Sequence, residues 1–279
     1  REIPCFALTE PTAGSDAASM TSHGELIKGD DGEYYIKLNW NKRYITLAAV
    51  STILGLAFKL RDPNNYLGKG KELGITCALI PSNTKGVVLG DRHDPLHTPF
   101  YNCPTQGNDV VVPVDCIIGG IEQVGTGWNM LMECLTAGRG ISLPAQGTGV
   151  AAVSLRAVSA HAALRKQFGL PIGKFEGIEE PIARMTGQTY MMEAMRKFTL
   201  GALNKGIKPP VITAMAKFNA TELARKVVTD GMDVVGGNGI SMGPRNILGK
   251  YHIAGPIGIT VEGANILTRT LMIFGARCA

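Results

Sequence analysis

Aromatic residues, clustered charge and long apolar runs are all scarce in this sequence. Aromatic residues make up 6% of the 279 residues, and the net charge of +5 is spread along the chain. A nucleic-acid-binding protein usually gathers lysine and arginine in one stretch or on one face, so we expect no nucleic-acid partner. No apolar run reaches the ~20 residues that cross a membrane as a helix. The hydrophobic content of 45% instead indicates a well-packed globular enzyme.

Metal-binding and disulfide patterns are missing too. The cysteines form no CxxC pair, and none lies at zinc-ligand spacing from a histidine, so we expect no metal site. We interpret the cysteines as small buried hydrophobic residues in a reducing compartment. They are Cys5, Cys77, Cys103, Cys116, Cys134 and Cys278.

The two halves of the chain have different periodicities. Short β-prone runs bounded by turns fill the first half, at residues 34–39, 76–80 and 110–112. From about residue 125 apolar residues recur at helical spacing, at residues 128–139, 144–168, 179–203, 211–235 and 262–274. The pattern predicts an α+β fold. We expect a small β-barrel or sandwich domain at residues 1–124 and a helical bundle at residues 125–279.

The run Ala-Leu-Thr-Glu-Pro-Thr-Ala-Gly-Ser-Asp at residues 7–16 is rich in small and hydroxyl-bearing residues. Such a loop can approach a phosphate or a cofactor ring closely. The run resembles the signature that opens the middle domain of the acyl-CoA dehydrogenase family, and every specified position of that signature is met. The resemblance implies FAD as the cofactor, with contacts from Leu8, Thr9, Gly14 and Ser15.

Residues 41–46, Asn-Lys-Arg-Tyr-Ile-Thr, resemble the strand of this family that contacts the flavin. The resemblance implies that Tyr44 lies against the isoalloxazine ring and that Thr46 lies near its reactive N5 edge. Most relatives carry tryptophan at the position of Tyr44. The alternative is a tyrosine that only packs across neighbouring strands.

Two segments of the helical half resemble the family's contacts to the FAD of a neighbouring subunit. The turn at residues 162–169 is similar to the family's Arg-x-x-Phe-Gly turn, which implies cofactor contacts from Arg165, Gln167 and Phe168. The loop at residues 233–239 is similar to Gln-x-x-Gly-Gly-x-Gly, with aspartate in place of glutamine, and implies contacts from Gly236 and Gly237. A homo-oligomer, at least a dimer, is therefore expected.

The segment Ile-Thr-Val-Glu-Gly-Ala-Asn at residues 259–265 resembles the one that carries the family's catalytic base. The resemblance implies that Glu262 removes the substrate α-proton, and that Arg139 on the helix opening the C-terminal domain faces the active site. A partly desolvated carboxylate has a pKa nearer the working pH, which suits a base. As alternatives, Glu262 only stabilises the start of the next helix, or Glu133 is the base.

The resemblance implies an FAD-dependent acyl-CoA dehydrogenase that oxidises fatty acyl-CoA to trans-2-enoyl-CoA in β-oxidation and passes electrons to an electron-transferring flavoprotein. Residues 255–265 look most like the bacterial fatty-acid-degradation branch, which acts on medium- to long-chain acyl-CoA. The family resemblance further implies an N-terminal helical domain that is missing from this chain. It also implies a bacterial cytoplasmic location, and it leaves open a membrane association through absent segments. An acyl-CoA oxidase and a non-catalytic flavin- or acyl-CoA-binding paralogue remain alternative functions.

Overall fold

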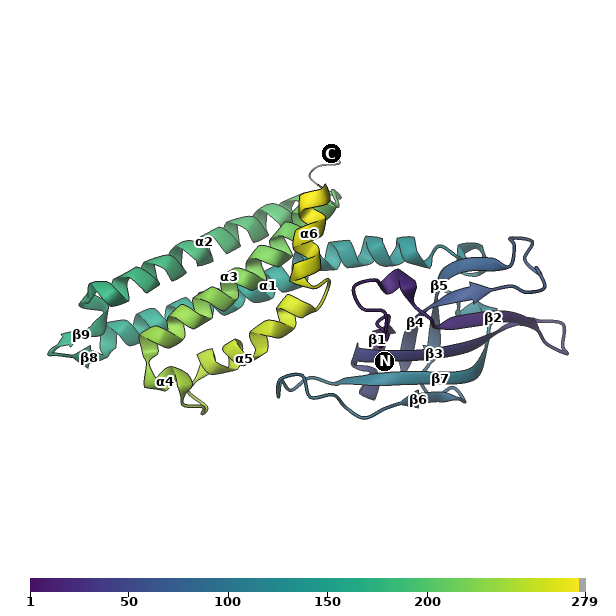
Figure 1. The fold of residues 1–279 in the computed structure, drawn as a ribbon, viewed down its shortest axis with the longest axis horizontal. Coiled ribbons are helices and arrows are strands. Elements are labelled where there is room, and N and C mark those ends of the chain that lie inside the picture. The colour runs from purple at the N-terminus through teal and green to yellow at the C-terminus, as the bar shows by residue number, and fades with distance from the viewer. Residues whose placement is uncertain (276–279) are drawn as a thin grey trace. The chain divides into compact units, whose positions relative to one another are not determined.

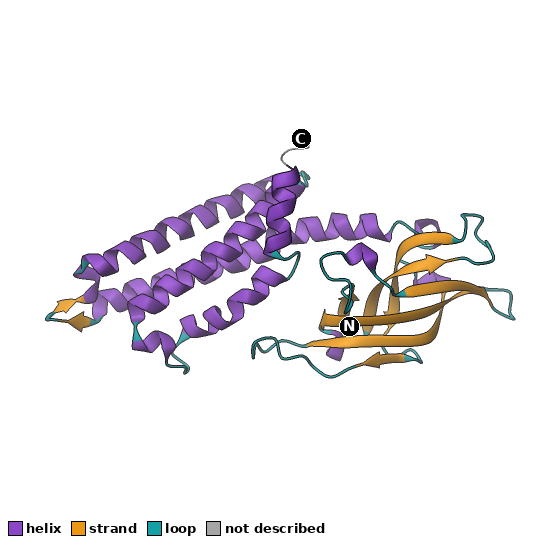
Figure 2. Ribbon diagram, in the orientation of Figure 1, coloured by secondary structure: helices purple, strands orange, loops and turns teal. Residues whose placement is uncertain are grey.

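The computed structural model describes residues 1–275 of the chain, which divides into two compact units at Met132 and Glu133. The first unit is built on one seven-stranded sheet with the strand order β1-β4-β2-β3-β7-β6, and β5 pairs with β4. Figure 2 shows that this sheet is strongly curled. The strands are β1 Pro4–Ala7, β2 His23–Lys28, β3 Tyr34–Thr46, β4 Ile53–Arg61, β5 Glu72–Pro81, β6 Val87–Leu89 and β7 Asn102–Pro113.

Alternating side chains of β3 and β4 build the core of this unit. Ile36 and Leu38 from β3 pack with Leu56 from β4, and all three are fully buried. Trp40 lies across Gly107 of β7, where an added Cβ would meet the indole ring at 2.1 Å. Only glycine leaves room for the ring at that position, and the sheet closes tightly over its core.

The second unit is a helical bundle. Its helices are α1 Gly127–Leu164, which begins in the first unit, α2 Glu176–Asn204, α3 Pro210–Val235, α4 Gly237–Ile240, α5 Ile247–Thr260 and α6 Asn265–Gly275. Helices α1, α2 and α3 lie side by side, and α5 runs along α3 (Figure 1). Val158, Met185, Met192 and Val227 fill the space between the long helices. Methionines at these positions pack as core residues, since the thioether adapts to irregular gaps.

The α+β fold class predicted from the periodicities is confirmed, but three details of the prediction are wrong. Residues 128–164 form one helix, not two, although Pro144 lies inside it. A proline inside a helix removes one hydrogen bond and crowds the carbonyl four residues earlier, here that of Gly140, yet α1 continues. Gly140 lets α1 pack closely on α3, since an added Cβ would lie 2.6 Å from Cγ2 of Thr213. Helix α5 was not expected, and the last helix begins at Asn265 rather than at residue 262.

The cysteines are only in part the buried residues that were expected. Cys5, Cys77 and Cys103 are buried, but Cys134 is exposed on α1. Cys278 lies outside the described residues.

Within residues 1–275 no single helix is both long and apolar enough to cross a membrane. In this part of the chain, only α5 and α6 taken together, across a 53° bend, meet the length and composition of a span.

Candidate functional site

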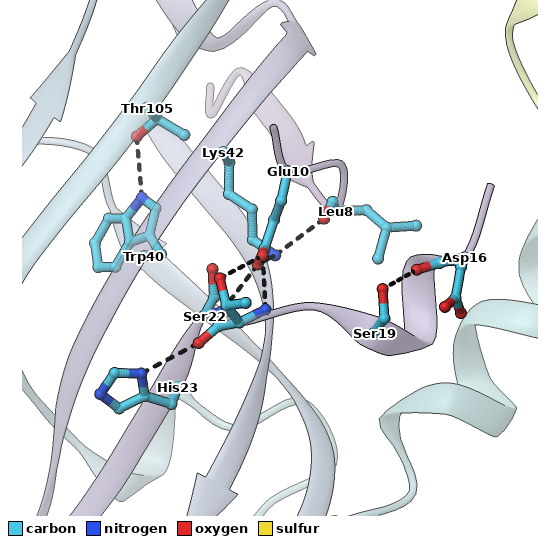
Figure 3. A network of polar contacts seen from close by, with 10 residues as sticks. Leu8, Glu10, Asp16, Ser19, Ser22, His23, Trp40, Lys42 and Thr105 are labelled. Carbon is cyan, nitrogen blue, oxygen red and sulfur yellow. Dashed lines mark hydrogen bonds and ion pairs between the residues drawn. The ribbon is translucent and has the colours of Figure 1, made fainter. Parts of the chain in front are cut away.

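The loop that follows β1 is anchored by a buried ion pair. Glu10 is 3% exposed, and its carboxylate lies 2.8 Å from the ammonium of Lys42 on β3. The carboxylate also accepts hydrogen bonds from Thr21 and from the Ser22 N–H, while Lys42 donates to the Leu8 carbonyl (Figure 3). Burial alone raises the pKa of Glu10, but the hydrogen bonds from Lys42, Ser22 and Thr21 lower it to about 2. This pair fixes the point at which the loop leaves the sheet.

The predicted cofactor-binding residues of this loop are open to a ligand. Gly14 and Ser15 are exposed, and Leu8 and Thr9 are half-buried. A Cβ at Gly14 would meet no atom within 4 Å. The Thr9 carbonyl accepts a hydrogen bond of 3.0 Å from the Arg43 N–H, which ties the loop to β3. The loop therefore has a fixed base and an accessible tip of small residues.

A β-bulge in β3 turns Tyr44 and Thr46 to one outer face. Up to Lys42 the even-numbered residues of the strand point into the core, and the pairing with β7 then shifts between Lys42 and Ile45. Tyr44 occupies the bulge with a φ of 61°. Because the extra residue inverts the alternation, Ile45 is buried while Tyr44 and Thr46 are exposed. The two predicted flavin-contacting residues thus share one side of the sheet.

The Tyr44 ring is held by its neighbours and still presents half of its surface. Its centroid lies 5.0 Å from that of the His93 ring and 4.2 Å from Cζ of Arg43, whose guanidinium stacks over it. The residue is 53% exposed. This is a supported aromatic surface, available to a planar ligand.

Arg165, Gln167 and Phe168 lie in a short hairpin formed by β8 Lys166–Gln167 and β9 Leu170–Pro171. Phe168 and Gly169, with φ values of 53° and 82°, form its two-residue turn. Phe168 is 93% exposed, and its ring meets Phe175 edge-on at 6.1 Å. Within the described residues the Arg165 guanidinium has no hydrogen bond or ion pair. A free guanidinium beside an exposed ring suits a ligand with phosphate and planar groups.

A surface hollow of the helical unit, with a volume of about 500 Å³, gathers the predicted cofactor-binding residues of this unit. Gly236 ends α3 with a φ of 58°, and a Cβ at Gly236 or Gly237 would meet no atom within 4 Å. The backbone there can approach a ligand closely. Five of the predicted residues line the hollow: Arg165, Gln167, Phe168, Gly236 and Gly237.

The turn between α5 and α6 places Glu262 beside Arg139 of α1. Glu262 and Gly263 both have positive φ values, 55° and 86°. The positive φ of Gly263 favours glycine, and a Cβ there would lie 3.0 Å from Nη2 of Arg139. A residue other than glycine held at positive φ costs free energy, and such residues cluster at functional sites.

Three ionisable groups meet at this turn. Burial raises the pKa of Glu262, while the charges of Lys217 and Arg139 oppose the rise. More than a third of Glu262 is exposed, so its desolvation is partial. Burial lowers the pKa of Arg139, and burial together with the charge of Arg139 lowers that of Lys217 to about 8. Among the described residues, Nε of Arg139 is buried without a partner. Such a grouping of perturbed charges is typical of a reactive site.

Neither alternative role finds support in the contacts of the carboxylates. Helix α6 begins at Asn265, and its first helical hydrogen bond runs from the Thr268 N–H to the Ala264 carbonyl. In the part of the chain that the structure covers, the Glu262 carboxylate accepts no hydrogen bond, so it does not cap this helix. Glu133 is paired with Lys208 on the surface.

Two buried lysines at these sites, Lys42 and Lys217, were missed by the sequence analysis. A signal was present for each. Lys42 continues the inward-facing alternation of β3, two residues after Trp40. Lys217 falls on the apolar face of α3, between Ala214 and Ala220. A lysine at a core position is rarely buried without a specific partner. The core positions of Lys42 and Lys217 therefore indicated that each lysine has a buried hydrogen-bond acceptor.

The two family profiles that match this chain describe the acyl-CoA dehydrogenase middle domain, at residues 5–110, and the acyl-CoA dehydrogenase C-terminal domain, at residues 125–272. The chain is 58% identical to the protein HemX of Proteus mirabilis over 93 residues. That match covers 33% of this chain and 55% of HemX. It is 32% identical to the short-chain specific acyl-CoA dehydrogenase of Megasphaera elsdenii, over 86% of this chain and 59% of that enzyme.

Among solved structures, butyryl-CoA dehydrogenase from Megasphaera elsdenii superposes with a TM-score of 0.83 and 28% identity, over 100% of this chain and 68% of that one. The chain spans 54–59% of the length of the curated relatives it matches. The profiles together cover both structural units. The chain belongs to the acyl-CoA dehydrogenase family.

Proposed function

We propose that this chain carries the cofactor- and substrate-binding parts of an FAD-dependent acyl-CoA dehydrogenase that converts a fatty acyl-CoA to the trans-2-enoyl-CoA. The observation that carries the proposal is Glu262, held on a strained turn beside Arg139 and Lys217. A carboxylate with a pKa raised by partial burial is a stronger base than one in water, and nearby cations keep it ionised.

The residues present suit FAD. The unpaired guanidinium of Arg165 would hold its diphosphate, the open backbone at Gly236 and Gly237 would receive its adenosine end, and Tyr44 with Thr46 would contact its ring. When bound, FAD supplies the acceptor for the hydride that leaves the substrate β-carbon. Because the Arg165 contact would be made to a neighbouring subunit's cofactor, the active form would be a dimer or larger.

Glu262 would take the α-proton as the C–H electron pair forms the new double bond. In the described residues the backbone N–H of Glu262 has no acceptor. It can therefore donate to the thioester oxygen, on which negative charge develops as the proton leaves. The same residue would thus provide the base and one of the donors that acidify the α-carbon.

We extend the proposal to medium- and long-chain substrates of β-oxidation, with an electron-transferring flavoprotein as the acceptor. The support is the likeness of residues 255–265 to the bacterial fatty-acid-degradation branch. A series of saturated acyl-CoA substrates from short to long would measure the preference. Fastest turnover with the shortest members would contradict this extension and leave the dehydrogenase assignment standing.

The decisive experiment is the visible spectrum of the purified protein before and after a saturated acyl-CoA is added without oxygen. We expect a yellow protein whose flavin absorbance bleaches. A colourless protein that FAD does not reconstitute would exclude the assignment. Rapid reoxidation of the reduced protein by air, in place of electron transfer to the flavoprotein, would favour the oxidase.

A further inference from the structure

Lys217 on α3 reaches the turn that carries Glu262 from inside the helical unit. Its side chain has no exposed surface. Its ammonium donates to the carbonyl of Ile259 at 3.2 Å, to the carbonyl of Gly263 at 2.8 Å and to Oδ1 of Asn265 at 2.7 Å. The first acceptor lies at the end of α5, the second directly follows Glu262, and the third begins α6.

A second link ties the start of α6 to the same helix. The Asn265 amide donates to the Thr221 hydroxyl at 2.9 Å and to Oε1 of Glu222 at 3.0 Å. Asn265 is buried, and Thr221 lies one helical turn after Lys217. The turn is therefore fixed to α3 at both of its ends, while Glu262 in the middle stays accessible.

We propose that Lys217 is a positioning residue for Glu262: its three hydrogen bonds hold the segment 259–265 so that the Glu262 carboxylate is presented in one place. The inference rests on the proposed function of Glu262 as the base. The Lys217 side chain has no exposed surface, and its ammonium bonds oxygens on both sides of the turn, so it acts through Glu262.

An ammonium matches this task better than a neutral side chain. Burying a charge is costly unless its hydrogen bonds are satisfied, and here three donors meet three oxygens. The charge also acts on its surroundings. The ionisable groups that face Lys217 are Arg139 from α1, Glu222 from α3 and Glu262 from the turn. Lys217 and Arg139 both lower the pKa of Glu262 against the effect of burial.

The test compares three variants of the purified protein. Lys217→Gln removes the charge and keeps a donor, Lys217→Arg keeps the charge, and Lys226→Gln removes a charge from the exposed side of the same helix as the matched control. The measurements are FAD content, kcat and KM for acyl-CoA, the pH dependence of flavin reduction, and amide hydrogen exchange of residues 259–265 without substrate.

For Lys217→Gln we expect normal FAD content and KM, and faster exchange at residues 259–265. Flavin reduction should slow by about 10²-fold, the scale on which small misplacements of a catalytic group act. The acidic limb of its pH profile should move to higher pH, because the base has lost a neighbouring cation. Lys217→Arg should restore the position of that limb and part of the rate, and Lys226→Gln should match the wild type.

A Lys217→Gln protein with the wild-type rate, acidic limb and exchange would overturn the proposal. If that variant does not fold, Asn265→Ala replaces it: faster exchange and slower reduction are expected, and wild-type values for both would refute the idea. If the wild-type protein itself does not bleach, the proposed function fails. The exchange data would then still decide whether Lys217 holds the turn.

Discussion

Glu10 and Lys42 form an ion pair of 2.8 Å in which neither side chain has more than 1% of its surface exposed. The pair joins the loop after β1 to the middle of β3, and Lys42 also holds the Leu8 carbonyl at 2.9 Å. The signature loop and the strand proposed to contact the flavin therefore share one buried anchor.

Glu10→Gln should destabilise the β unit by about 3–5 kcal/mol, because it leaves the Lys42 ammonium buried without its counter-charge. Urea unfolding would measure the loss. The matched control is Asp109→Asn, which removes the exposed pairing of Asp109 with Lys37 and should change stability by no more than the error of the method. Equal changes in the free energy of unfolding for the two substitutions would show that the buried pair stabilises the fold no more than the exposed pair does.

The stability contributed by Glu10 should depend on pH in a defined window. Its pKa is about 2 in the folded protein against a usual 4.5, so the folded state favours the ionised form. The contribution is complete above pH 4.5, amounts to about 3 kcal/mol, and is lost as the pH falls towards 2. The difference in unfolding free energy between wild type and Glu10→Gln should shrink over this range. A constant difference would contradict the assignment.

Glu262→Gln should keep FAD and acyl-CoA binding while flavin reduction slows by at least ~10²–10⁴-fold, the typical contribution of a general base. The substitution preserves size and removes the basic lone pair. Stopped-flow reduction and the melting temperature would be measured together, with Glu133→Gln as the control carboxylate. Near-normal reduction by Glu262→Gln would exclude it as the base.

Arg165→Ala should lower FAD retention without unfolding the bundle, because the guanidinium is exposed and makes no hydrogen bond or ion pair within the described residues. Arg156→Ala changes an exposed arginine of α1, nine residues before Arg165, and should retain the cofactor. FAD content after gel filtration and the mass in solution would be compared. Normal flavin content in Arg165→Ala, or a fully active monomer, would refute the proposed role.

Much of the architecture could be predicted from the sequence because hydrophobic periodicity depends on local geometry. The β half, the helical half and the limits of α2 and α3 follow from it. Pro144 misled the prediction, because whether a proline ends a helix depends on packing as well as on local sequence. Helix α1 continues through Pro144 in close contact with α3 at Gly140 and Gly147. Helix α5 escaped prediction because its apolar residues do not gather on one face, and because Pro256 and three glycines interrupt its sequence.

The candidate site divides in the same way, between features that local sequence predicts and features that packing decides. The sequence by itself determined which residues carry the family's motifs, because a motif is a matter of residue type and spacing. Only the tertiary structure decided which groups surround them. Lys217 precedes Glu262 by 45 positions, and Lys42 follows Glu10 by 32. Each lysine is buried because folding brings distant carbonyls and carboxylates to its ammonium, and no local pattern encodes the distance between such partners.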